Sequence, residues 1–486
     1  MANVNPSLND VFSQMRHYID PKKIPTVVKS LDTALSNMNS VKKEEAQRVN
    51  QCVQDILSTL AMLAEAVEKK YAEAVRKIPP LHEEEARQPF DNARKKILTS
   101  LQPIVALLTK IKIKAARLQE NKEKIVQVKA KPELPSAQET LYLKYLVSQL
   151  EQLLPEGPVL QANQKTALED FLRKQAEENL HLLIPLVLHR TIQHSKKEHL
   201  IDVLESLYPQ SKEYFSYESG QRLILPHGME IAVAHLQKKG AISLPCEVFG
   251  DMLHLQERLL LLAKKGEKTV HTFLFANCAA ELGRAHWAPL LFYPNDDGSE
   301  YRLVITNSIG TLESGSMLVG MLKQIGREIT AKTNKPCKIF FFEQQRQRDS
   351  ANCSLFALHD VVRFSKSREL IRSYFENLLA VYQNHPKDEA IALDTLPHHD
   401  FMRPTQSIKQ IEKDFAQSVR YASQTRAKKL KEKRAKLDRA DYRVVAVFNK
   451  SSRQIEMKKQ NFFIARQAVK YDALIWKHII SEAQKS

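Results

Sequence analysis

The sequence predicts an α+β protein in which a small mixed sheet is flanked by helices, with long helical extensions at both ends. The chain of 486 residues has only 12 glycines and is rich in Ala, Leu, Glu, Lys and Gln, a composition that favours helices. Between residues 270 and 342, four short apolar runs rich in aromatic and β-branched residues interrupt this pattern. Such runs are typical of strands. We therefore expect a sheet in that stretch and helices on either side.

We expect the chain to consist of four regions. Residues 1–128 are expected to form a helical hairpin or coiled coil, because apolar residues recur at spacings of three and four through 49–78, and Pro79-Pro80 ends that helix before a second one at 83–121. A Pro-containing linker opens a helical flanking region at 129–240, a candidate for substrate binding. Residues 241–400 form the core, and 401–486 a basic helical region.

Within the core, the order of elements is expected to be strand, strand, strand, helix, strand, helix. An Asn-Asp-Asp-Gly stretch at 295–298 predicts a hairpin turn between the second and third strands. The last helix is expected to begin close to Cys353. The four strands are expected at 270–276, 286–293, 301–306 and 337–342, with the intervening helix at 314–333.

The five cysteines argue against a disulfide framework and against a zinc site. Their number is odd and no two have CxxC spacing, which favours a reducing compartment in which thiols persist. The first 20 residues lack the apolar core of a secretory signal, and no apolar stretch reaches membrane-spanning length. We therefore expect a soluble protein.

Positive charge is concentrated at the C-terminal end. Residues 401–486 carry 21 Lys/Arg against 8 Asp/Glu, which accounts for most of the net charge of +17. The run QTRAKKLKEKRAKLDR at 424–439 has no aromatic residue, whereas single-stranded nucleic-acid sites use aromatics for stacking. We expect no nucleic-acid partner, and either a solvated helix face or contact with an anionic membrane or inositol phosphate.

Four residues in the core have the chemistry of a thiol enzyme. Cys353 lies where a polar loop turns into an apolar helix, and a helix N-terminus stabilises a thiolate. His286 opens one predicted strand and Asn307 ends the next, so a hairpin would bring them within reach. Asn307 could then hold the imidazole. Gln347 lies six residues before Cys353, and its amide could donate to an oxyanion. Structural roles are expected for His359, Cys278 and Cys337.

The order His286-Trp287, Asn307-Ser308 and Gln347-x5-Cys353 resembles that of the clan CE ubiquitin-like-protease (Ulp/sentrin protease) family. That family includes bacterial effector deubiquitinases and is related to the YopJ-type acetyltransferases. Two departures stand out: Asn replaces the usual acid, which leaves Asp296 or Asp297 as an alternative partner of the histidine, and Ser354 replaces a glycine.

The resemblance implies an Ulp-like cysteine protease core that cleaves after the C-terminal glycine of ubiquitin or a ubiquitin-like modifier. Cys353 is then the nucleophile, His286 the base, and Trp287 the roof of a substrate channel, although a core aromatic is the alternative reading of Trp287. Neither a metal nor a cofactor is required. The expected partners are ubiquitin or ubiquitin-like conjugates.

Two other functions stay open. A YopJ-type acetyltransferase would use the same cysteine to carry an acetyl group from acetyl-CoA, and inositol-phosphate activation would suit its basic C-terminal region. An inactive helical scaffold is the third reading. Helical extensions around a small core also resemble virulence effectors that bacteria secrete into the host cytoplasm, where this chain could lie at a membrane surface.

Overall fold

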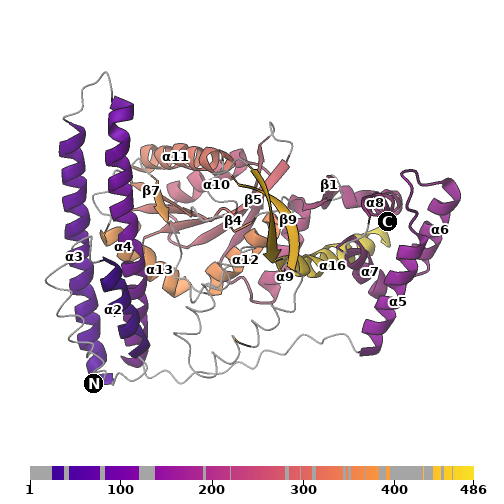
Figure 1. The fold of residues 1–486 in the computed structure, drawn as a ribbon, viewed down its shortest axis with the longest axis horizontal. Helices are drawn as coiled ribbons and strands as arrows, with labels where there is room; N and C mark the ends of the chain where they lie inside the picture. Colours follow the sequence, from indigo (N-terminus) through magenta and orange to yellow (C-terminus); the bar gives the residue numbers. More distant parts are fainter. Residues whose placement is uncertain are drawn as a thin grey trace.

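The computed structural model describes residues 24–37, 43–76, 83–119, 137–189, 193–218, 221–279, 284–295, 297–308, 313–342, 346–347, 352–366, 368–381, 390–393, 431, 442–449, 454–461 and 463–485. A central sheet lies between two groups of helices (Figure 1), one formed by the N-terminal hairpin and the other by helices of 137–240 together with the C-terminal helix. The expected division at residues 128, 240 and 400 stays a prediction.

The central sheet has six strands in the order β3-β4-β5-β6-β7-β8. The β4–β5 and β5–β6 pairs are antiparallel, and the other three pairs are parallel. The prediction of an α+β fold with a small mixed sheet is therefore confirmed, although β3 and β8 were not predicted. The strands are β3 (Cys246–Phe249), β4 (His271–Ala279), β5 (Arg284–Pro294), β6 (Tyr301–Ile305), β7 (Cys337–Phe342) and β8 (Ile391–Leu393).

Alternation along the strands separates two cores on opposite faces of the sheet. Phe273 and Phe275 of β4 pack with α10 (Met252–Lys264) and α11 (Glu313–Thr333). Leu274 and Ala276 instead pack with α12 (Cys353–Lys366). This period of two is what a strand buried on both faces requires. The helices at 313–333 and 353–366 confirm the predicted order of elements.

The N-terminal region contains α2 (Ile24–Asn37), α3 (Lys43–Val75) and α4 (Glu83–Gln119). Helices α3 and α4 are antiparallel: Arg94 pairs with Glu68 at 2.9 Å near one end, and Lys112 bonds Gln54 at 3.3 Å further along. The predicted apolar stripe is buried from Val49 to Leu60 and partly buried at Leu63 and Val67. The hairpin packs on the core through α13 (Arg368–Val381), where Asn377 Nδ2 donates to Thr109 Oγ1 at 2.9 Å.

The second helical group encloses the C-terminal helix α16 (Phe463–Ala483). Asp472 of α16 is buried and pairs with Arg222 and His189, each at 2.7 Å. The helix is thereby attached to the body of the protein. The other elements of this group are α5 (Ala137–Leu153), α6 (Ala162–Arg173), α7 (Glu177–Leu188), α8 (His194–Leu207), η3 (Pro209–Glu213), β1 (Phe215–Glu218), β2 (Gln221–Ile224) and α9 (Pro226–Lys238).

Two predictions about helices are wrong. Within the flanking region, the sequence predicts a single helix at 163–193, but the structure has two helices, α6 and α7, because the chain turns between 174 and 176. The C-terminal region is not helical throughout: β9 (Tyr442–Asn449) and β10 (Gln454–Asn461) form an antiparallel hairpin. The run Val444–Val445–Ala446–Val447 carries the β-branched signal that the high charge around it obscured. The basic run 424–439 lies outside the described residues, apart from the helical Lys431.

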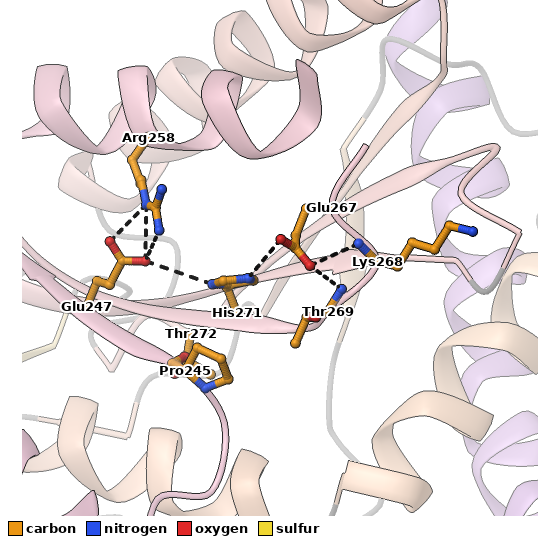
Figure 2. A network of polar contacts seen from close by, with 8 residues as sticks. All are labelled: Pro245, Glu247, Arg258, Glu267, Lys268, Thr269, His271 and Thr272. Atoms are coloured by element: carbon orange, nitrogen blue, oxygen red, sulfur yellow. Dashed lines mark hydrogen bonds and ion pairs between the residues drawn. The ribbon is translucent and has the colours of Figure 1, made fainter. Parts of the chain in front are cut away.

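A polar network braces one end of the sheet (Figure 2). Glu247 of β3 bonds the Arg258 guanidinium at 2.8–3.1 Å, and its carboxylate lies 3.8 Å from His271 Nδ1. Glu267 lies 3.9 Å from His271 Nε2 and accepts the Thr269 backbone N–H at 2.8 Å. Burial lowers the pKa of His271, an effect that the two carboxylates oppose. Because His271 and Asn277 stand about 20 Å apart along β4, this network is remote from the strand position that pairs with His286.

Among the described residues, no helix combines the length and the apolar content that crossing a bilayer requires.

We predict that the α3–α4 interface contributes strongly to stability. Leu108 is fully buried in it, whereas Leu141 of α5 is 65 % exposed. Leu108→Ala should lower the free energy of unfolding by about 2–5 kcal/mol because it leaves a cavity, and Leu141→Ala by no more than about 0.5 kcal/mol. Chemical denaturation followed by circular dichroism measures both. Equal losses for the two variants would contradict the packing described here.

Candidate active site

The β5–β6 hairpin brings His286 and Asn307 together. His286 is the third residue of β5, and Asn307 follows β6 by two residues. Leu290 pairs with Ile305 in the antiparallel ladder, so the beginning of β5 lies beside the end of β6. His286 Nε2 and Asn307 Oδ1 are 2.8 Å apart. The hydrogen bond expected from the hairpin is present, and the catalytic roles of the two residues stay a prediction.

This bond determines the form of the imidazole. A carboxamide oxygen only accepts hydrogen bonds, so Nε2 carries the hydrogen and Nδ1 keeps a lone pair. Burial lowers the pKa of His286, while the hydrogen bond that it donates to Asn307 raises it to a smaller extent. The imidazole is therefore neutral at neutral pH, as a general base must be.

The structure does not support either Asp296 or Asp297 of the hairpin turn as an alternative partner of His286. Asp297 accepts the Ser299 backbone N–H at 2.8 Å in the turn that follows Pro294. Pro294 lies eight positions after His286 on β5, about 26 Å away along an extended strand. Asp297 thus cannot reach the imidazole, and Asp296 lies outside the described residues.

Cys353 is the first residue of α12 and is 1 % exposed. The Asn352 carbonyl accepts the backbone N–H groups of Leu355 and Phe356 at 3.1 and 3.2 Å, which starts the helix at this point. Helix α12 packs against β5, the strand that carries His286, and Cys353 shares a buried cluster with Trp287. The sulfur therefore lies at the positive end of a helix dipole.

Gln347 is 1 % exposed and is held by Ser308, the residue after Asn307. Ser308 Oγ donates to Gln347 Oε1 at 2.7 Å, and the Ser308 carbonyl accepts the Gln347 backbone N–H at 2.8 Å. Because the amide oxygen is engaged by the hydroxyl, the amide N–H₂ points away from Ser308 as a donor. The Asn307-Ser308 sequence motif indicated the position of Ser308, but it did not predict the contact of Ser308 with Gln347.

Trp287 lies in the hydrophobic core. It is 1 % exposed, and its indole Nε1–H donates to the Ile224 carbonyl at 2.7 Å. These contacts match the alternative reading of Trp287 as a core aromatic.

Ser354, which stands where the resembled family has glycine, is also buried, and its hydroxyl has no hydrogen-bond partner among the described residues. Two other cysteines have raised pKa values because of burial: the pKa of the partly buried Cys246 thiol rises to about 11, and that of the buried Cys337 thiol rises further. His359 is half-buried on α12. In the part of the chain that the structure describes, no group of His, Cys, Asp and Glu side chains is arranged to hold a metal ion.

Comparison with known proteins indicates one family. The family model described as YopJ Serine/Threonine acetyltransferase matches residues 278–464. This stretch is less than half of the chain, and it contains His286, Asn307, Gln347 and Cys353. No curated protein matches the chain.

Solved structures of two proteins are similar at low identity. AvrA delL154 with IP6 and CoA is 14 % identical over 58 % of this chain and 98 % of its own, with a TM-score of 0.38. HopZ1a in complex with IP6 is 11 % identical over 71 % of this chain and 99 % of its own, with a TM-score of 0.33. HopZ1a with IP6 and CoA gives 10 % identity, 69 % and 97 % coverage, and a TM-score of 0.29.

The prediction of a cysteine protease specific for ubiquitin-like proteins is wrong. The family model that matches the candidate site is that of an acetyltransferase, an enzyme of a different reaction class. A cysteine, a histidine and an oxyanion donor serve acyl transfer to water and to other acceptors alike, so the site residues alone could not separate the two. The substrate-channel role of Trp287 and the ubiquitin partners belonged to the protease prediction and have no support.

We predict that Asn307→Asp raises the pKa of His286. A carboxylate at this position stabilises the imidazolium, whereas the native carboxamide is neutral. On acidification, the imidazole is then protonated at a higher pH than in the parent. The acidic limb of the pH–activity profile therefore moves to higher pH. NMR titration of the imidazole, assigned by comparison with His286→Gln, measures the shift.

Asn295→Asp is the matched control, because it makes the same charge change in the turn at the other end of the hairpin. It should leave the titration of His286 unchanged. An unshifted pKa in Asn307→Asp would contradict the assignment of Asn307 as the partner of the imidazole.

Proposed function

We propose that the protein is a YopJ-type acetyltransferase that moves an acetyl group from acetyl-CoA, through Cys353, to serine, threonine or lysine side chains of a target protein. One observation carries the proposal: the matched acetyltransferase family model spans the four residues that the sequence motifs predict as a site. The bond between His286 and Asn307 supports it, because it leaves a neutral imidazole with Nδ1 as the acceptor.

In the first half-reaction, His286 Nδ1 takes the proton of the Cys353 thiol. The thiolate attacks the thioester carbonyl of acetyl-CoA, and the carbonyl oxygen becomes an oxyanion. The Gln347 amide and the Cys353 backbone N–H donate hydrogen bonds to it. Collapse of the tetrahedral intermediate breaks the bond to the CoA sulfur. CoA leaves, taking a proton from the imidazolium, and the acetyl group stays on Cys353 as a thioester.

In the second half-reaction, a hydroxyl or amine of the target attacks this thioester. His286 accepts the proton of the attacking group, and the same donors stabilise the second oxyanion. Collapse releases the acetylated target, and the Cys353 sulfur recovers the proton from His286. The burial of Cys353 limits the access of water, which favours transfer over hydrolysis of the thioester.

The setting follows from the same family. We propose that the protein is a bacterial effector acting in a host cell, with a role in virulence. The basic region 401–486 is proposed to contact an inositol phosphate or an anionic membrane through its charge. AvrA and HopZ1a are described with IP6, and for AvrA and one HopZ1a structure with CoA as well. Reducing surroundings and solubility stay predictions.

Cys353→Ala tests the proposal. The parent, incubated with acetyl-CoA and IP6, should gain one acetyl group on Cys353 as a hydroxylamine-labile thioester, which intact-protein and peptide mass spectrometry detect. Cys353→Ala should lose this adduct and all transfer to a target protein. Gln347→Ala should slow transfer by about 10²–10³-fold, the typical effect of losing an oxyanion donor.

Cys246→Ala is the control, because Cys246 is a thiol whose burial disfavours the thiolate. It should retain the adduct. Transfer that persists in Cys353→Ala, or a parent that forms no adduct with acetyl-CoA, would refute the proposal and favour the inactive scaffold.

A further inference from the structure

A buried ion pair lies beside the candidate site. Arg346 and Asp360 are 1 % and 2 % exposed, and the guanidinium contacts the carboxylate with both nitrogens: Nη1 to Oδ1 at 3.0 Å and Nη2 to Oδ2 at 2.6 Å. Thr306 Oγ1, fully buried, donates to Asp360 Oδ2 at 2.6 Å. The Arg346 guanidinium also lies 5.4 Å from the centre of the Phe356 ring. This set is called the Arg346–Asp360 network below.

Each member of the network is close in sequence to a site residue. Thr306 precedes Asn307, and Arg346 precedes Gln347. Asp360 lies on α12, two helical turns after Cys353. The network therefore joins the end of β6, the segment 346–347 and the nucleophile helix, which carry three of the four proposed catalytic side chains.

Adjacent residues at the end of β6 point to different partners. Thr306 bonds Asp360 on α12, whereas Asn307 bonds His286 on β5, as expected where successive side chains alternate in direction. The next residue, Ser308, accepts the backbone N–H groups of Arg346 and Gln347 at 2.8 Å each. Three consecutive residues thus relate the base, the nucleophile helix and the amide donor to one another.

The energetics of burial favour a role in geometry over a role in stability. Removing a guanidinium and a carboxylate from water costs several kcal/mol per ion, and well-packed apolar residues of similar volume often stabilise a protein equally well. A two-pronged Arg–carboxylate contact, however, defines both distance and angle between the elements that carry it. Stability alone does not require this pair.

We propose that Arg346 and Asp360 are positioning residues, which hold Cys353 on α12 in register with His286–Asn307 and with Gln347. The inference rests on the proposed acetyl transfer. The contacts described for the network run to Thr306 and to the Phe356 ring. The network acts by fixing the distance and angle at which α12 meets the end of β6, and a displacement of about 1 Å in such a site can cost about 10²-fold in rate.

The test replaces the ion pair by apolar residues of similar volume, Arg346→Met with Asp360→Leu, and compares it with Asp360→Asn, which keeps the shape and the contact from Thr306. We expect the melting temperature of the double variant to stay close to that of the parent, and its kcat for acetyl transfer to fall by about 10²-fold. The KM for acetyl-CoA should change little, because the network contacts no substrate. Arg346→Lys, which retains charge without the two-pronged contact, should recover only part of the lost kcat.

A second readout does not depend on acetyl transfer. The rate at which iodoacetamide alkylates Cys353, followed against pH by peptide mass spectrometry, reports the thiolate and its histidine. The profile should change in the double variant and in Asp360→Asn. If the parent transfers no acetyl group, the proposed function fails while this profile still tests the positioning.

The control is Arg94→Met with Glu68→Leu, which removes from the α3–α4 hairpin an ion pair whose side chains are 7 % and 12 % exposed. It should leave both kcat and the alkylation profile at parental values. The inference is overturned if the Arg346/Asp360 double variant is folded with parental kcat and alkylation, or if the control changes them equally. If the double variant does not fold, the same comparison is made with Asp360→Asn: a lowered kcat and a changed alkylation profile support the inference, and parental values overturn it.

Discussion

The register of the β5–β6 hairpin is the constraint on which the candidate site depends. Pairing Leu290 with Ile305 puts the first residues of β5 beside the chain that leaves β6, and only then can Asn307 accept a bond from His286. A shift of one residue would turn every side chain of a strand to the opposite face. The packing of β5 opposes such a shift, because Leu290 and Leu291 pack in different cores. Core packing thus sets the geometry of the histidine.

The same dependence explains how much could be predicted from the sequence. The strands at 286–293, 301–306 and 337–342 were predictable because each is a local apolar run with a turn or helix beside it. From the hairpin, the contact between His286 and Asn307 followed. The β9–β10 hairpin was missed because charged residues surround its β-branched run. The bond from Trp287 to the Ile224 carbonyl joins residues 63 positions apart, and nothing local signals it.

The residues of the sequence motifs do not distinguish a protease from an acetyltransferase. An acyl-thioester of Cys353 is common to both reactions, so the thiol, the imidazole and the oxyanion donor are required equally by each. The two reactions differ in the leaving group and in the acceptor. Both of these groups would contact residues around the cysteine rather than the motif residues themselves. Trp287 was read as a contact of the substrate, yet its ring is buried and its N–H is bonded within the core. A tryptophan after the histidine is therefore no guide to the substrate in this chain.

Helix α12, which begins at Cys353, is restrained from several directions. Its first turn packs on Ala468 of α16 through Leu355 and Phe356, and α16 is in turn held by the buried pair of Asp472 with Arg222. Its later turns are bonded to Thr306, the residue after β6, through Asp360. Helix α16 and helix α12 therefore restrain one another through apolar contacts, and the first turn of α12, which contains Cys353, depends on a helix more than 100 residues later in the chain.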